Sequence, residues 1–262
     1  MNCEGKQNVH SPRQNSTRDR GVTRHWPCDG GGTCQGRGPR PVSYGRSAQE
    51  AESLVSEIQA KGGRAEAISA DLGTPNGAEL LAKQVRSIVG DRLDVLVLNA
   101  GISKAARIAD YTVEEFDNLF ATNVRSPFFL VQQLLPVLGD GSNIVLISSA
   151  VARTVVGNPG LENPSILAYA STKGAIETLV KHWAAILGPS GIRVNAVAPG
   201  VIDTDMSNFT KTEAGREVTF GMQALKRIGK PEDVADVVAF VVSDGARWIT
   251  GASIPVDGGS KL

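Results

Sequence analysis

The sequence predicts an α/β protein with a doubly wound parallel sheet, folded as a single domain. Two observations lead to this prediction. Segments with helical periodicity alternate with short apolar segments of strand length from about residue 43 onward. The apolar segments lack the polar alternation of a sheet with one face in water, so helices must cover both faces.

Capping signals and periodicity place the elements in order. Ser47 and Glu50 have the spacing of a capping box and Gly62 is a helix stop, so the first helix lies between them. A second capping box, Thr112 with Glu115, opens a long helix. The other predicted elements are strands over residues 64–71, 93–101, 143–149 and 193–200, and helices over 77–89, through 116–138, over 169–187 and, with a proline at its first position, over 231–243.

Composition limits the class of function. The 262 residues are enough to bury a substantial core. Basic and acidic residues balance at 27 each, which gives no overall argument for a nucleic-acid or anionic-membrane partner. No apolar run reaches the roughly 18 residues of a membrane span. Without the apolar stretch of a secretory signal, the predicted location is the cytoplasm.

Residues 1–42 differ in composition from the rest. They contain no Ala, Ile, Leu or Phe, and they hold all three cysteines. So little apolar surface cannot offset the entropy of ordering the segment. We therefore divide the chain into an aberrant polar segment, 1–42, and a domain over 43–262, and we expect the first strand and helix of that domain to be disordered or altered.

Three predicted strands end in polar or glycine-containing sequence. These ends are residues 99–101 (Asn-Ala-Gly), 148–149 (Ser-Ser) and 199–200 (Pro-Gly). Doubly wound sheets bind ligands at the carboxyl ends of their strands. The functional site is therefore predicted at this edge.

Tyr169 and Lys173 are four residues apart and share one face of a predicted helix. An ammonium beside a phenol stabilises the phenolate and lowers a pKa that is ordinarily about 10. Such a tyrosine exchanges a proton with a carbonyl or alcohol oxygen. The same spacing also occurs on ordinary surface helices, so the pair alone leaves both interpretations open.

Three further polar residues have two interpretations each. Ser149 either hydrogen-bonds the same substrate oxygen or caps a helix. Asn99 either belongs to the site or holds two strand ends together as a turn residue. Asn123, a poor helix former in mid-helix, either faces solvent or binds a water that links Lys173 to bulk.

Taken together and in chain order, the motifs SADL, LNAG, FATNV, LISS, YASTK, NAVAPGVIDT, RIGKPEDVA and ITGASIPVDGG resemble the short-chain dehydrogenase/reductase family. The resemblance covers about residues 43–259 and is greatest to acyl-carrier-protein ketoreductases and to glucose and small-alcohol dehydrogenases. It implies a Rossmann-like fold and hydride transfer between a nicotinamide cofactor and a carbonyl or secondary alcohol.

The resemblance also implies a role for each matching residue. The catalytic set is Tyr169 as acid/base, Lys173 to lower its pKa and hold the nicotinamide ribose, Ser149 to orient the carbonyl, and Asn123 to hold a relay water. The cofactor set is Asp71 and Leu72 beside adenine, Asn99, Ala100 and Gly101 along the cofactor, and Pro199, Gly200, Ile202 and Thr204 at the nicotinamide end. A homotetramer built on the two long helices is implied as well, and no metal.

The choice between NAD and NADP is made at the end of the second strand. A carboxylate there would bind the ribose 2′-hydroxyl, whereas an arginine accommodates a 2′-phosphate. This chain offers Arg46 and Ser47 and no carboxylate, which predicts NADP(H). The alternative is an arginine that only solvates the start of a helix.

Two segments depart from the family or leave the substrate open. The loop 150–168 is longer than the family commonly has, and residues 206–223 stand where a substrate lid would be. Neither identifies a ligand. His182 has no Cys or carboxylate at ligand spacing and is predicted to lie on the surface.

Gly32, Gly36 and Gly38 have the letters of a dinucleotide phosphate loop without its context. No strand precedes Gly32, and Gly38 stands only eight residues before Arg46, too few for a crossover helix. The glycine pattern is therefore not the phosphate loop.

A shifted reading frame supplies the missing loop. Read one base forward with permitted codons, residues 15–29 become T-A-L-V-T-G-A-S-R-G-I-G-R-A-M, with glycines at positions 20, 24 and 26. The last of these precedes Arg46 by the 20 residues that a phosphate loop requires. Our hypothesis is that residues 7–43 are frame-shifted, and that the chain as it stands binds cofactor weakly.

Other interpretations of the amino-terminal segment remain. It is a divergent tail, or a metal site formed by Cys3, His10, His25, Cys28 and Cys34, whose spacing fits no standard zinc pattern. With seven Arg and Lys residues it could instead be a nucleic-acid-binding arm. The rival for the whole chain is a non-catalytic binding protein that keeps the reductase fold without its phosphate loop.

Overall fold

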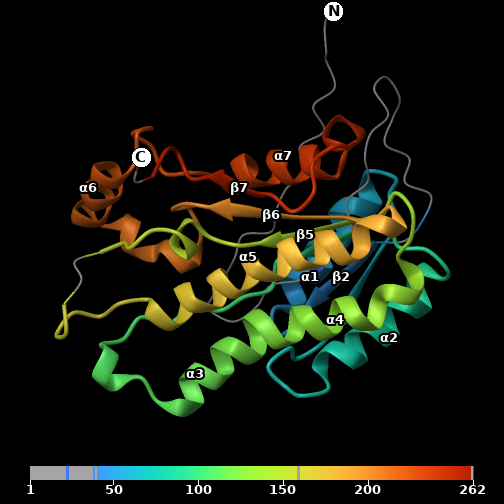
Figure 1. Cartoon of the computed structure of the whole chain (residues 1–262), viewed down its shortest axis with the longest axis horizontal. Helices are drawn as coiled ribbons and strands as arrows, with labels where there is room; N and C mark the ends of the chain where they lie inside the picture. Colours follow the sequence, from blue (N-terminus) through green and yellow to red (C-terminus); the bar gives the residue numbers. More distant parts are fainter. Residues whose placement is uncertain (1–21, 24–37, 39, 158–159, 261) are drawn as a thin grey trace, which may run out of the picture.

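The computed structural model describes residues 22–23, 38, 40–157, 160–260 and 262. Its main sheet has the strand order β1-β4-β5-β6-β7. Four of these strands are parallel neighbours: β4 (Val95–Leu98), β5 (Asn143–Ile147), β6 (Arg193–Pro199) and β7 (Ser253–Val256). Helices lie on both sides of this sheet (Figure 1). The predicted Rossmann-like α/β fold is confirmed.

The first strands depart from a regular doubly wound sheet. β2 (Arg40–Tyr44) pairs in parallel only with β3 (Ala65–Ser69), as a separate two-stranded sheet. β1 (Val22–Thr23) is antiparallel to β4, with Val22 opposite Leu98. Among the described residues, the edge of β4 away from β5 is therefore paired over two residues only. β2 also begins inside the segment 1–42 that the composition set apart.

Apart from α6, the main helices follow the predicted order. They are α1 (Ala48–Ala60), α2 (Gly77–Val89), α3 (Val113–Phe120), the π-helical turn η2 (Ala121–Arg125), α4 (Ser126–Leu134), α5 (Leu167–Leu187), α6 (Glu213–Met222) and α7 (Pro231–Val242). Short 3-10 turns complete the chain at η1 (Ile108–Asp110), η3 (Leu135–Val137), η4 (Ala150–Ala152), η5 (Gly188–Ser190), η6 (Asp205–Lys211) and η7 (Asp244–Ala246).

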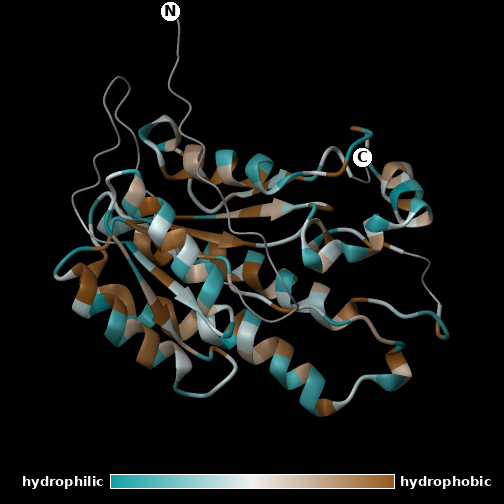
Figure 2. Cartoon of the chain, turned by 180° about the vertical axis from the view of Figure 1, so that it is seen from behind, coloured by the Kyte–Doolittle hydropathy of each residue, from teal (hydrophilic) through white to brown (hydrophobic). Residues whose placement is uncertain are grey.

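Strand β4 shows how the sheet separates two cores. Leu96 and Leu98 belong to the larger core, which α2, α4 and α5 cover, while Val95 and Val97 belong to a second core under α7. Successive side chains of a strand point to opposite faces, so a strand that is buried on both sides must be apolar throughout. Figure 2 shows these strands as brown segments inside the molecule, with teal segments on the surrounding helices.

The capping predictions had mixed outcomes. The Thr112–Glu115 box is present, with the Glu115 amide donating to Thr112 Oγ1 over 3.1 Å. Gly62 has φ +80° just beyond the end of α1, as a helix stop requires. The Ser47–Glu50 box is wrong: Ser47 occupies the N-cap position of α1 without a side-chain capping bond, because its backbone (φ −87°, ψ 64°) departs from the usual extended N-cap conformation.

Two elements were missed and one helix is divided. The predicted elements did not include α6 or β7, and β7 pairs with β6. The long helix predicted through residues 116–138 is α3, η2 and α4 in succession, with the π-helical turn around Asn123. Such turns often mark functional positions.

Candidate active site

The polar strand ends meet at one edge of the sheet. Asn99 follows β4, Ser148 and Ser149 follow β5, and Pro199 ends β6. These strands are parallel neighbours, so their carboxyl ends point the same way. In Figure 1 the loops at this edge and α6 lie beyond the tips of the strand arrows.

The Tyr169–Lys173 pair is buried on α5. Tyr169 is 7% exposed and Lys173 2%, so the pair does not lie on a solvent-facing helix surface. Lys173 Nζ lies 5.5 Å from the centroid of the Tyr169 ring and donates to the Ile147 carbonyl over 2.7 Å. The helix therefore places a cation beside the phenol and fastens it to the end of β5.

Asn123 is a buried connection between three segments. Its Oδ1 accepts from the Ile102 amide over 2.8 Å, and its Nδ2 donates to the Ile102 carbonyl over 2.9 Å and to Thr172 Oγ1 over 3.0 Å. Only 1% of the surface of Asn123 is exposed, so the alternative in which it faces solvent is wrong. Its side chain joins η2 to the segment after β4 and to α5, beside Lys173.

Gly101 lies buried beside two polar side chains. A Cβ atom at this position would lie 3.4 Å from Asn123 Oδ1 and 3.5 Å from Lys173 Nζ. The backbone of Gly101, the amide of Asn123 and the ammonium of Lys173 therefore meet.

Ser149 ends β5 and begins η4. Its Oγ accepts from the Val151 amide over 3.4 Å, the geometry of a weak cap. The capping interpretation is thus present in the structure. It does not exclude the other role, because a hydroxyl that accepts one hydrogen bond keeps its own hydrogen to donate.

The candidates for the adenine end lie at the ends of β2, β3 and β4. Leu72 and Ala100 line one small cavity, which Leu98 and Leu130 also line. Asp71 is exposed and its Oδ1 accepts from the Gly73 amide over 2.9 Å.

Arg46 is exposed just beyond β2, next to Ser47 at the start of α1. The guanidinium is therefore accessible to a ligand at this edge.

The candidates for the nicotinamide end lie on a loop after β6. The Gly200 amide donates to the Val256 carbonyl over 3.0 Å, and a Cβ on Gly200 would lie 2.7 Å from Asp257 Cα, so the close approach requires glycine. Ile202 pairs with Gly229, and Thr204 precedes η6, its amide donating to Ser207 Oγ over 3.2 Å. The loop is thus held from two sides.

The long loop 150–168 is attached to the segment after β4, which the sequence did not predict. Ala106 and Ser165 exchange two backbone hydrogen bonds of 3.0 and 2.8 Å. The Tyr111 hydroxyl lies 2.9 Å from the carbonyl oxygens of both Lys104 and Ser165, and burial raises the pKa of this phenol. These contacts fix the chain just before α5 begins.

The described part of the chain contains no candidate metal site and no candidate membrane span. Within it, no three His, Cys, Asp or Glu side chains are grouped to hold a metal ion, and no helix is long and apolar enough to cross a membrane. His182 is exposed on α5, as predicted. The proposed Cys/His site and the frame-shifted loop lie outside the described residues, apart from Val22, Thr23, Gly38 and residues 40–43.

Comparisons with known proteins show which family the chain resembles. The family model described as enoyl-(acyl carrier protein) reductase matches residues 33–261. Versicolorin reductase 1 of Aspergillus parasiticus is 39% identical over 232 residues, 84% of this chain and 85% of that protein. The 3-oxoacyl-[acyl-carrier-protein] reductase FabG of Staphylococcus aureus is 38% identical over 222 residues, 84% of this chain and 87% of that protein.

A solved structure is similar over the same extent. A short chain dehydrogenase from Burkholderia cenocepacia in complex with NADP has a TM-score of 0.78 and 35% identity, covering 85% of this chain and 87% of that one. The chain therefore belongs to the short-chain dehydrogenase/reductase family of oxidoreductases.

Proposed function

We propose that this protein is an NADP(H)-dependent carbonyl reductase in which Tyr169 exchanges a proton with the substrate oxygen. The observation that carries the proposal is the buried Tyr169–Lys173 pair at the carboxyl edge of the sheet, with Nζ 5.5 Å from the phenol ring. An ammonium beside a phenol stabilises the phenolate form. Proton exchange with a carbonyl or alcohol oxygen is the chemistry that this arrangement favours.

Each neighbouring residue has a part in the proposed reaction. Tyr169 donates its proton to the carbonyl oxygen as negative charge develops there, and Ser149 donates a hydrogen bond to the same oxygen. Lys173 stabilises the phenolate that Tyr169 becomes, and Asn123 holds a water that returns the proton from bulk. When bound, the cofactor supplies the hydride that reduces the carbonyl carbon.

The residues present fit a nicotinamide cofactor at its reactive end. The nicotinamide ribose would lie beside Gly101 and Lys173, where its hydroxyls match an ammonium. Leu72 and Ala100 lie together on one small cavity, and adenine would pack outside it against these two residues. Binding of NADP by the similar Burkholderia protein supports the choice of NADP(H).

Carbonyl reduction is favoured over reduction of a carbon–carbon double bond. The family description names an enoyl reductase, whereas FabG is named a 3-oxoacyl reductase. The test is NADPH consumption by the full chain with a 3-oxoacyl thioester, an aromatic ketone and an enoyl thioester. We expect turnover of the ketones alone. Turnover of the enoyl thioester alone would contradict the proposal, and NADPH binding without any turnover would support the non-catalytic rival.

Arg46 is proposed to select NADP. Because its guanidinium is exposed, we expect Arg46→Ala to raise KM for NADPH by on the order of tenfold and to leave KM for NADH nearly unchanged. Arg64→Ala is the matched control. Arg64 is also exposed, but it precedes β3 and so lies at the amino-terminal end of the strands, away from the proposed site. Equal effects on both cofactors would show that Arg46 only supports the start of α1.

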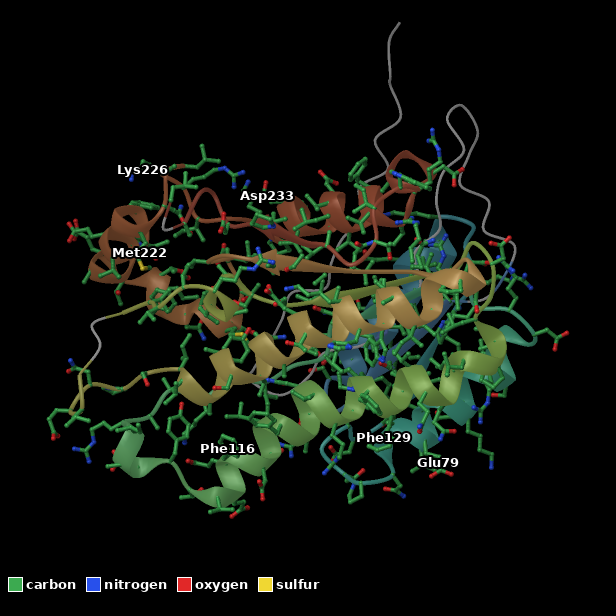
Figure 3. All side chains as sticks on the ribbon, viewed as in Figure 1. Glu79, Phe116, Phe129, Met222, Lys226 and Asp233 are labelled. Carbon is green, nitrogen blue, oxygen red and sulfur yellow. The ribbon has the colours of Figure 1, made fainter. Side chains whose placement is uncertain are left out.

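We also propose a cytoplasmic homotetramer formed through the long helices. Apolar side chains of α3 and α4 are exposed, and Figure 3 places Phe116 and Phe129 along these two successive helices. Phe128 and Leu135 are exposed on the same stretch. Exposed aromatic side chains in this number favour burial against another copy. Sedimentation of the chain and of Phe129→Glu measures the assembly.

A further inference from the structure

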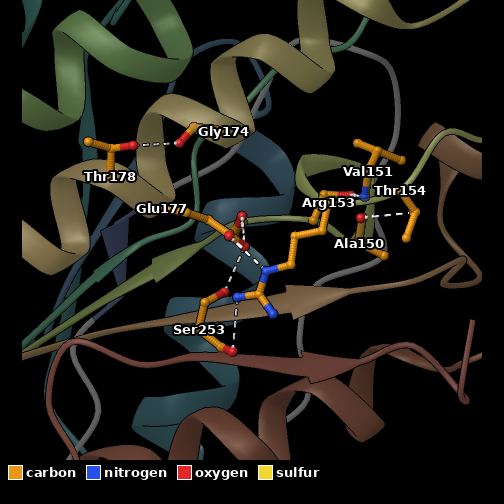
Figure 4. A network of polar contacts seen from close by, with 10 residues as sticks. Ala150, Val151, Arg153, Thr154, Gly174, Glu177, Thr178 and Ser253 are labelled. Carbon is orange, nitrogen blue, oxygen red and sulfur yellow. Dashed lines mark hydrogen bonds and ion pairs between the residues drawn. The ribbon is translucent and has the colours of Figure 1, made fainter. Parts of the chain in front are cut away.

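One carboxylate on α5 connects three elements around the proposed site (Figure 4). Glu177 lies one turn after Lys173, and its side chain is 13% exposed. Its Oε2 accepts from Arg153 Nε over 2.8 Å, and its Oε1 accepts from Ser253 Oγ over 2.8 Å and from Ser148 Oγ over 3.3 Å. Arg153 Nη2 also donates to the Ser253 carbonyl over 3.1 Å.

The contacts of Glu177 lie on both sides of Ser149 in the sequence. Ser148 immediately precedes Ser149, and Arg153 follows the η4 turn that Ser149 begins. Both bind the same carboxylate, so the short loop carrying Ser149 is held at its two ends by one side chain. The Glu177 carboxylate thereby fixes where that loop lies against α5.

The helix holds the end of β5 at two successive residues. Lys173 Nζ binds the Ile147 carbonyl, and one turn later Glu177 binds the Ser148 hydroxyl. Tyr169, Lys173 and Glu177 follow one another at intervals of four residues, on the same face of α5. Helix α5 therefore carries the phenol and also holds the end of β5 in place.

Stability alone is a weak explanation for this network. The Arg153 side chain is 46% exposed, and ion pairs with so exposed a partner contribute little to folding. Geometry is the stronger explanation, since a catalytic group works only within about 0.5 Å of its productive position.

We propose that Glu177 is a positioning residue, which acts through Ser148 and Arg153 to hold the Ser149 hydroxyl at the substrate oxygen beside Tyr169. This inference rests on the proposed carbonyl reduction. It assigns Glu177 no contact with substrate or cofactor.

The kinetic test is a double-mutant cycle between Glu177 and Ser149. We expect Glu177→Gln to lower kcat for ketone reduction by roughly 10- to 100-fold with little change in the Kd for NADPH. In a Ser149→Ala background the same substitution should have almost no further effect, because its action passes through Ser149. Arg153→Ala should reproduce the loss. Thr178→Ala is the control, since Thr178 follows Glu177 on α5 and its hydroxyl donates to the Gly174 carbonyl within the helix rather than to the Ser149 loop.

Amide hydrogen exchange gives a readout that needs no activity. Exchange of residues 149–154 should be faster in Glu177→Gln than in the unmodified chain, while that of α2 stays the same. Unchanged exchange, or an equal kcat loss with and without Ser149, would overturn the assignment. If the unmodified chain reduces no ketone, the proposed function fails, and the exchange result still decides whether Glu177 holds the loop.

Discussion

Replacing Tyr169 by phenylalanine is expected to lower kcat for ketone reduction by about 10²- to 10⁴-fold. The substitution removes the hydroxyl that we propose as the proton donor to the substrate oxygen, and it keeps the buried ring. Affinity for NADPH should change by no more than about twofold. The lost interaction, between the phenol hydroxyl and the substrate oxygen, is made in the transition state and does not contribute to cofactor binding. Single-turnover kinetics and an NADPH titration measure the two effects separately.

Tyr111→Phe is the matched control for this result. Tyr111 is another partly buried phenol near the start of α5, and its hydroxyl contacts the carbonyl oxygens of Lys104 and Ser165. Its loss should cost stability on the order of 1 kcal/mol and leave kcat within a few-fold of the unmodified value. If Tyr169→Phe kept most of the activity, or if both variants lost it equally, Tyr169 would not be the acid/base.

The sequence predicted best where a local pattern decides the structure. The bounds of α2 agree with the predicted ones, because the helical pattern of apolar residues continues without a break from Gly77 to Val89. Tyr169 and Lys173 were found because both lie on one helix, where a spacing of four residues is a contact. In such cases the partners are near in the chain, so a single sequence contains the whole signal.

Prediction failed where partners are distant in the chain. Asn123 is buried because it bonds to Ile102 and Thr172, 21 and 49 residues away. Glu177 binds Ser253, 76 residues away. No periodicity records such pairs, although the position of Glu177 one turn after Lys173 was a signal that could have been followed.

The first strand and helix are where sequence and fold disagree most. Among the described residues, β4 meets only the two residues of β1 on one side, and they run antiparallel to it. β2 and β3 pair with each other and share no hydrogen-bonded ladder with the main sheet, although β2 lies beside β1. The family model, moreover, matches from residue 33 and leaves out the first 32 residues. All three observations concern the region that the frame-shift hypothesis addresses.

Restoring the shifted reading over residues 15–36 is expected to raise the affinity for NADPH by at least about 100-fold over the chain as it stands. The restored sequence places glycines at positions 20, 24 and 26, where backbone N–H groups at a helix start can bind the pyrophosphate. Each hydrogen bond to a charged group contributes roughly 1.5–3 kcal/mol, so two suffice for this gain. Titration of both chains with NADPH, after their masses are verified, measures the difference.

A control separates the phosphate loop from general repair of the fold. In the restored chain, alanine in place of the three recovered glycines should keep the added strand and helix but remove the close approach of the backbone to the phosphates. Thermal unfolding of this variant should then show the stability of the restored chain. The NADPH titration should show the weak binding of the original chain. Micromolar NADPH binding by the chain as it stands would contradict the prediction of weak cofactor binding, because the cofactor would then bind without a glycine loop.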